Sequence, residues 1–125
     1  MSKKLLKESL GLPINSVRVG DIIYSVYNYS DAYIPTFYEV ISKSPKSVVV
    51  RSLEKSINPP RSMYDDGSCE PIPGEYTKSF SSGEHIKPVR IIARNGELST
   101  PANKWYVSGF YKYEGRPVRY HYMTD

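Results

Sequence analysis

Three runs rich in β-branched and aromatic residues, separated by turn-forming residues, dominate the stretch from Gly20 to Glu54. In the second run, residues 37–42 alternate between two sets of side chains with the period of two that is typical of a strand. The third run begins with three consecutive valines. Between these two runs lies Ser44–Lys46, which predicts a turn because its proline fixes φ and lacks an N–H. The pattern therefore predicts an antiparallel meander.

The first ten residues predict a short helix. Ser2 can cap it, and Leu6 and Leu10 lie on one face at a spacing of four. Gly11 and Pro13 then end it. So short a helix needs packing to be stable, and its leucine face could pack either on this sheet or on a neighbouring subunit.

Two polar stretches predict loops. Residues 28–35 form a tyrosine-bearing loop between the first two strands of the meander. The stretch 57–75 is rich in Pro, Gly and Asp, and its length suggests a functional loop or a mobile insert.

The C-terminal part returns to short strands. A strand is expected within 86–94, followed by a turn at Asn95 and Gly96. Residues 105–113 and 116–123 flank Glu114 and Gly115, which predicts a second hairpin.

The fold class expected is mainly β (α+β), with a short N-terminal helix followed by an antiparallel meander or small open barrel of six or seven strands. All 125 residues form one domain in this interpretation. It is divided into an N-terminal helix (1–13), a β meander (14–56), a long loop (57–75) and C-terminal strands (76–125).

The charge is mild overall but unevenly distributed. The net charge is +4, from 17 Lys/Arg and 13 Asp/Glu. By segment it is +3 over 1–56 (8 − 5), −2 over 57–83 (2 − 4) and +3 over 84–125 (7 − 4). Duplex nucleic acid is not expected as a partner, because no dense basic stripe is present. A compact anionic partner fits this distribution better.

A cytoplasmic location is expected, without contact to a membrane. The single cysteine, Cys69, has no partner for a disulfide in the chain. The charged N-terminus lacks the apolar core of a signal peptide, and no run approaches the ~20 apolar residues of a membrane span.

Catalysis is not expected. Cys69 with His85 or His121 would provide a nucleophile and a base, but no catalytic motif surrounds them. The acidic residues near Cys69 lack the spacing of a calcium or zinc site, so neither a metal nor a cofactor is expected. Phosphate-binding loops of the Walker or Rossmann type are absent from the sequence.

Arginine residues interleaved with aromatic residues are the main functional signal. Guanidinium groups bind phosphate in a bidentate manner and aromatic rings stack on bases, so this composition points to a nucleotide or an unpaired strand. The residues expected to bind the ligand are Arg51, Phe80, Arg90, Arg94, Asn95, Trp105, Arg116, Arg119 and Tyr120. The alternative is that the tyrosines pack in the sheet and the arginines are cross-strand partners of Glu39, Glu54 or Glu97.

The meander also resembles a known class of proteins. Residues 19–24 read Val-Gly-Asp-Ile-Ile-Tyr, and residues 36–51 read Thr-Phe-Tyr-Glu-Val-Ile-x-Lys-x-x-x-Ser-Val-Val-Val-Arg. These motifs resemble small β-rich proteins of phages, prophages and plasmids. In size and in the order of helix and strands the chain is also similar to the anti-Thoeris sponge proteins.

That resemblance implies a non-catalytic role. Members of the sponge family bind the cyclic ADP-ribose signal that a bacterial defence system makes on infection, and so keep its effector inactive. They are homo-oligomers with pockets between subunits, and some also bind cyclic oligonucleotides. The resemblance covers roughly residues 1–55 and transfers no site residue.

Two functions from different classes follow. The first is a phage-encoded anti-defence protein in the cytoplasm of the host bacterium. It would be a homo-oligomer that sequesters a cyclic nucleotide signal without degrading it. The second is an SH3-like or OB-like module that binds single-stranded nucleic acid or a host protein with the same aromatic residues.

Overall fold

The centre of the molecule is an antiparallel sheet whose three longest strands follow one another in the chain. The computed structural model describes residues 11–29, 32–59, 66–99 and 109–121. Within them, β2 (Ile22–Tyr29), β3 (Ala32–Lys43) and β4 (Ser47–Asn58) pair in sequence order. The backbone N–H of Ser44 donates to the carbonyl of Ser47 at 2.8 Å and closes the turn between β3 and β4. The predicted meander and its turn are therefore confirmed.

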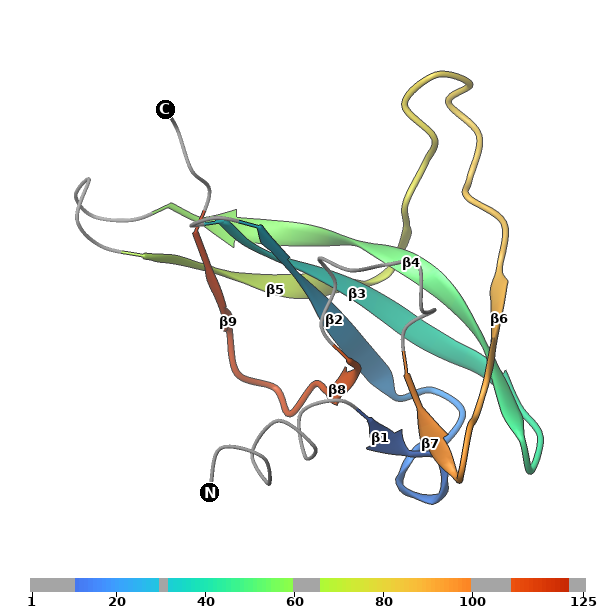
Figure 1. The fold of residues 1–125 in the computed structure, drawn as a ribbon. Coiled ribbons are helices and arrows are strands. Elements are labelled where there is room, and N and C mark those ends of the chain that lie inside the picture. Colours follow the sequence, from blue (N-terminus) through green and yellow to red (C-terminus); the bar gives the residue numbers. More distant parts are fainter. Residues whose placement is uncertain (1–10, 30–31, 60–65, 100–108, 122–125) are drawn as a thin grey trace, which may run out of the picture.

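Further strands extend both sides of the sheet, which is curled. β5 (Gly67–Tyr76) pairs with β4, β8 (Tyr111–Lys112) with β2, and β9 (Val118–Tyr120) with the start of β5. Backbone hydrogen bonds between Tyr33 and His121 bring the end of β9 to β3 as well. The result is a half-barrel in which the chain from β8 to β9 crosses from one edge to the other (Figure 1).

β4 has two partners along one edge. β6 (Val89–Ile92) pairs with its first half, and β5 pairs with its second half. A tight turn then leads into β7 (Glu97–Leu98). In that turn Asn95 and Gly96 have φ values of 53° and 78°. These left-handed conformations are the ones that a two-residue type I′ hairpin requires, so the turn expected there is confirmed.

Apolar side chains gather on both faces of the sheet. The first cluster contains Ile14, Val17, Ile23, Val40, Val48, Val50, Leu98 and Phe110. The second cluster contains Phe37, Leu53 and Cys69, with Ile22, Tyr24, Tyr76, Tyr113, Val118 and Tyr120 packed against them. We call the two faces of the sheet the first face and the second face accordingly. The second is covered partly by Tyr113, which lies between β8 and β9, and by Val118 of β9.

The helical content differs from the expectation. The helix expected over residues 2–10 lies outside the described residues. The end of the predicted helical segment is not helical, because β1 (Leu12–Pro13) pairs with β7 and a 3-10 turn, η1 (Ile14–Ser16), follows directly. Among the described residues, no helix has the length and apolar character needed to span a membrane.

Both predicted loops are in large part strands. β3 begins at Ala32 and so includes the last four residues of the loop predicted over 28–35. β5 occupies Gly67–Tyr76, within the stretch expected to be a long loop. Pro71 and Pro73 are tolerated there because β9 pairs with β5 only over residues 67–69, so no ladder on that edge needs their missing N–H groups.

The predicted C-terminal hairpin is also wrong in its pairing. β8 and β9 form at the expected places, but they pair with β2 and β5 and not with each other. Ile23 and Tyr24 provide the pairing edge for β8, and the inward side chains of β9 join the second cluster. Non-local pairing on two existing edges therefore replaces the local hairpin.

Candidate anion-binding site

Glu39, Arg51 and Tyr76 meet on the second face of the sheet. Strand alternation buries Val48 and Val50 on the first face, so Arg51 points to the second. Arg51 lies directly opposite Glu39 on β3. The Tyr76 hydroxyl donates a 2.8 Å hydrogen bond to Oε1 of Glu39. The Arg51 guanidinium carbon lies 3.7 Å from the centre of the Tyr76 ring, in a cation–π contact.

The Arg51 guanidinium is held in position but is not fully hydrogen-bonded. Its Nε atom is buried and has no hydrogen-bond partner within the described part of the chain. Buried donors in folded proteins are almost always satisfied, so such an atom requires an explanation. The hydrogen bond to Glu39 raises the pKa of Tyr76, and the positive charge of Arg51 acts in the opposite direction.

Arg90 lies on the same face in the neighbouring strand. It is paired with Val49, two residues from Arg51 along β4. Such diagonal neighbours have Cα atoms about 7–8 Å apart, within reach of two long side chains that share one ligand. Arg90 donates from Nη1 to Oγ of Ser47 at 3.1 Å and is otherwise exposed. We call Glu39, Arg51, Tyr76 and Arg90 the arginine site.

Arg119 belongs to a different cluster. It pairs with Asp66 and lies over the Tyr33 ring, with its guanidinium carbon 4.6 Å from the ring centre. Nδ1 of His121 lies 2.9 Å from Oδ1 of the same Asp66. Arg119 pairs with Ser68 of β5, and Ser68 in turn pairs with Asn58 of β4. Asn58 lies at the end of β4 that is remote from Arg51. Arg51 and Arg90 therefore occupy diagonal positions on one face, but the hydrogen bond of Arg90 goes to Ser47, which lies four residues before Arg51 along β4. Arg119 lies elsewhere, with its charge already paired.

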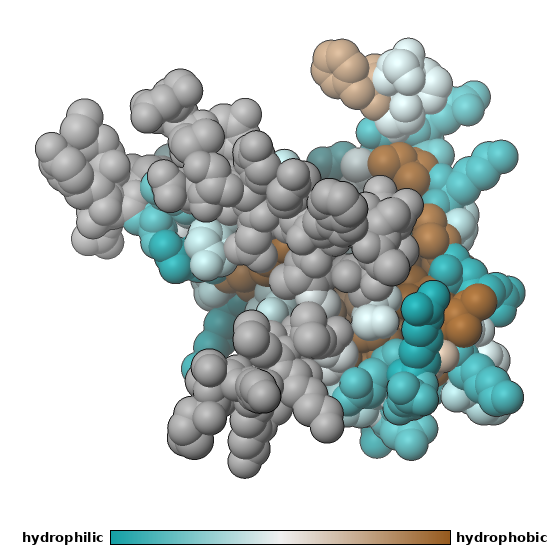
Figure 2. Space-filling model, viewed as in Figure 1, coloured by the Kyte–Doolittle hydropathy of each residue, from teal (hydrophilic) through white to brown (hydrophobic). Residues whose placement is uncertain are grey.

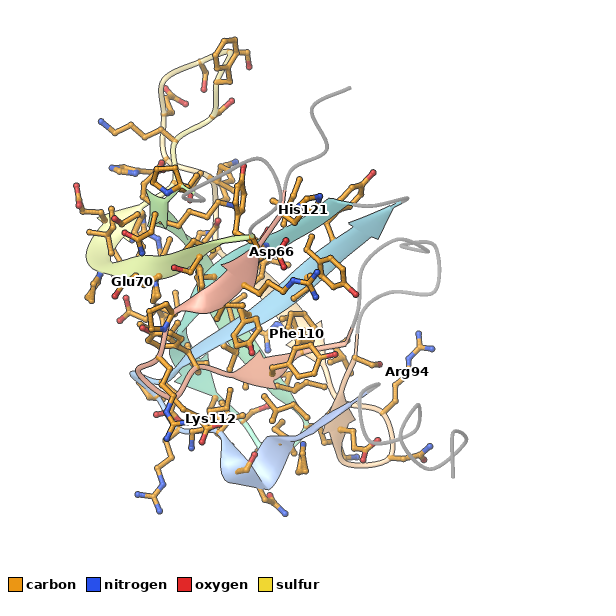
Figure 3. The ribbon with its side chains drawn as sticks, turned by 90° about the vertical axis from the view of Figure 1, so that its left-hand side faces the viewer. Asp66, Glu70, Arg94, Phe110, Lys112 and His121 are labelled. Carbon is orange, nitrogen blue, oxygen red and sulfur yellow. The ribbon has the colours of Figure 1, made fainter. Side chains whose placement is uncertain are left out.

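The other residues expected to bind the ligand are dispersed. Tyr120 packs against the second cluster, and Phe80 is fully exposed in the connection between β5 and β6. Arg94 and Asn95 form the turn after β6, and Figure 3 shows Arg94 projecting far from Asp66 and His121. Arg116 is exposed in the turn before β9. Trp105 lies outside the described residues.

Sequence reasoning missed Tyr76 as a functional residue and treated Glu39 as a structural alternative. That alternative is confirmed for two pairs, since Glu39 is the cross-strand partner of Arg51 and Glu97 is that of Arg94. Tyr76 carries no local signal, because its contact with Arg51 depends on the register of β4 against β5. That register shifts between Leu53 and Lys55, which no sequence pattern indicates.

The candidate nucleophile and bases lie apart from one another. Cys69 is buried in the second cluster, where burial raises the pKa of its thiol. Burial also lowers the pKa of the Lys55 ammonium, which donates to the carbonyl of Pro35 at 2.7 Å. His85 pairs with Lys78 through the backbone, and His121 faces Asp66. No group of three or more His, Cys, Asp or Glu within the described ranges could hold a metal ion.

Comparisons of the chain with protein-family models, with curated proteins and with solved structures give no match.

Proposed function

We propose that the protein binds a small anionic nucleotide at the arginine site and holds it without chemical change. The observation that carries this proposal is the buried Nε of Arg51, which is fixed over Tyr76 and has no hydrogen-bond partner in the described chain. Arg51 as a whole is only half-buried, so an oxygen of a phosphate group would bind its guanidinium from the exposed side with a charge-assisted hydrogen bond.

The chemistry of the site suits a nucleotide better than a simple inorganic anion. Arg51 and Arg90 supply two positive charges on neighbouring strands, and the Tyr76 hydroxyl adds a polar group beside them. Glu39 supplies carboxylate oxygens that accept hydrogen bonds from ribose hydroxyl or base amino groups. With one carboxylate and two guanidinium groups the site keeps a net positive charge, which suits a ligand with phosphates and hydrogen-bond donors.

The proposal is one of sequestration because the candidate nucleophile and bases of the described chain have other partners. A thiol whose pKa is raised by burial is a poor nucleophile at neutral pH, and this describes Cys69. Of the two histidines that could serve as a base, His121 faces Asp66 at β9 and His85 pairs with Lys78 through the backbone.

The biological role proposed is that of a phage anti-defence protein. The resemblance of the meander to sponge proteins suggests cyclic ADP-ribose or a cyclic oligonucleotide as the ligand, and a homo-oligomer in the bacterial cytoplasm as the working form. A rigid sheet that already holds Arg51 over Tyr76 keeps the ordering cost of binding low.

The test compares thermal stabilisation by ligand in two matched arginine variants. Wild type, Arg51→Met and Arg116→Met are melted with cyclic ADP-ribose isomers and with cyclic oligonucleotides. A ligand present at 100 times its Kd stabilises the folded state by about 2.7 kcal/mol. We expect one ligand class to raise the Tm of wild type and of Arg116→Met but not that of Arg51→Met. An equal rise in all three variants would refute the assignment of Arg51.

A further inference from the structure

An ordered arm projects from the sheet between β5 and β6 and carries a fully exposed phenylalanine. The backbone N–H of Ser79 donates to the carbonyl of Glu84 at 2.6 Å, and that of Ile86 donates to Thr77 at 2.9 Å, so the arm is a hairpin-like extension. The Phe80 side chain has a relative exposure of 106%. Figure 1 shows this arm extending beyond the sheet and leading directly into β6.

Within the described residues, the outer edge of β6 has backbone groups that no other strand pairs with. The N–H of Ala93 donates to the carbonyl of Lys46, and the ladder keeps this register through Val89. In an antiparallel ladder every second residue bonds to the partner strand, so Val89, Ile91 and Ala93 face β4. The N–H and C=O groups of Arg90 and Ile92 therefore point away from β4. Among the described residues no strand pairs with this edge.

The side chains along this edge are unusually apolar for an exposed strand. Val89 is 53% exposed and Ile92 is 64% exposed, one on each face of the strand. Figure 2 shows apolar residues among hydrophilic ones along the side of the molecule where β6 and the arm lie. Proteins usually protect such an edge, because it can accept a further strand.

The charges beside the edge are mainly basic. Residues 77–97 contain four Lys/Arg and two Glu, which gives a net charge of 4 − 2 = +2. Lys87 and Arg94 are exposed at the two ends of β6, and the exposed Lys46 lies opposite Ala93. Two copies of this chain paired edge to edge would bring two basic edges together, which is unfavourable. An acidic partner complements them.

We propose that β6 accepts an extended, acidic segment of a partner protein as an added strand, beside the Phe80 arm. Main-chain hydrogen bonds to Arg90 and Ile92 would hold the segment, and its carboxylates would lie near Lys87 and Arg94 at the two ends of β6. This interaction shares Arg90 with the arginine site, but it uses the backbone groups of Arg90, whereas the proposed nucleotide uses its side chain.

The test uses Ile92→Pro, which removes an outward N–H and leaves the ladder to β4 intact. Proline is tolerated at such a position in an edge strand. Ile92→Thr keeps the N–H and is the matched control. The probes are two fluorescein-labelled twelve-residue peptides, one alternating valine with glutamate and the other valine with lysine, and binding is followed by fluorescence anisotropy.

We expect the glutamate peptide to bind wild type at least tenfold more tightly than the lysine peptide. Ile92→Pro should lower that affinity at least tenfold and Ile92→Thr less than threefold. N-methylation of alternate peptide residues removes the peptide N–H groups that would donate to the carbonyls of Arg90 and Ile92, and one of the two alternations should abolish binding. The inference is overturned if both peptides bind equally, if neither binds, or if neither Ile92→Pro nor N-methylation weakens binding. A wild-type dimer that Ile92→Pro dissociates would also overturn it, in favour of a second copy as the occupant.

Discussion

Replacing Arg51 with methionine separates a binding role of this residue from a structural one. Methionine keeps an unbranched side chain over the Tyr76 ring but removes the guanidinium. The buried Nε has no partner in the described chain, and an unsatisfied buried donor costs about 1–3 kcal/mol. The cation–π contact that is lost with the guanidinium offsets part of this gain. We therefore expect the free energy of unfolding in the absence of ligand to be unchanged or raised by about 1 kcal/mol. In a domain of this size that gain corresponds to an increase in Tm of about 3–6 °C.

The assay is thermal and urea denaturation of the ligand-free protein, followed by far-UV circular dichroism. Arg116→Met is the control, because Arg116 is exposed in a turn and surface substitutions usually change stability by less than about 0.5 kcal/mol. A loss of more than about 2 kcal/mol in Arg51→Met would refute the reasoning, since a loss of that size indicates a buried charge whose partners have been removed.

Three further substitutions and one pH series test the structure. Phe37→Ala removes a fully buried ring whose centroid lies 5.6 Å from those of Tyr24 and of Tyr113. The free energy of unfolding, measured by urea denaturation, should fall by about 3–5 kcal/mol. A fall of less than about 1 kcal/mol would contradict the packing of the second cluster. Gly96→Ala should lower the free energy of unfolding by about 1–2 kcal/mol, because φ is 78° at this residue. Asn95→Gly should leave both the free energy of unfolding and ligand binding nearly unchanged. A larger loss in Asn95→Gly than in Gly96→Ala would exclude the type I′ turn. Burial raises the pKa of Tyr38 above 10.0, so above pH 10 the unfolded chain loses a phenol proton that the folded chain keeps. Its share of the unfolding free energy should therefore fall as pH rises through 10, by at most about 1.4 kcal/mol per pH unit. Melts between pH 8 and 11 should show a shallower fall in Tyr38→Phe, and an identical fall in both proteins would contradict this assignment.

The meander could be predicted from sequence because its signals are local. Alternation along residues 37–42 and the proline of Ser44–Lys46 each act within a few residues, and the same holds for the turn at Asn95. β5 could not be predicted, because Pro71 and Pro73 argue against a strand. Its pairing with β4 overrides that local preference.

The arginine site could be predicted only in part. Arg51 follows three valines, so its position on the opposite face to Val50 can be inferred from alternation alone. Its proximity to Arg90 requires the pairing of β4 with β6, and its contact with Tyr76 requires a register shift in β5. Arg119 resembles the other arginines in sequence, but the fold pairs it with Asp66. Tertiary pairing, which the sequence pattern does not encode locally, decides which arginines have free donors.

Calorimetric titration with cyclic ADP-ribose isomers and cyclic oligonucleotides tests the central claim most directly, with each ligand recovered afterwards and its mass measured. We predict saturable binding of one ligand class by wild type, recovery of that ligand intact, no binding by Arg51→Met and unchanged binding by Arg116→Met. The affinity should also fall only modestly between low and high salt, as expected for a single small ligand. Absence of binding by every ligand would contradict the account. A steep salt dependence would instead favour a protein that follows the backbone of a single-stranded nucleic acid.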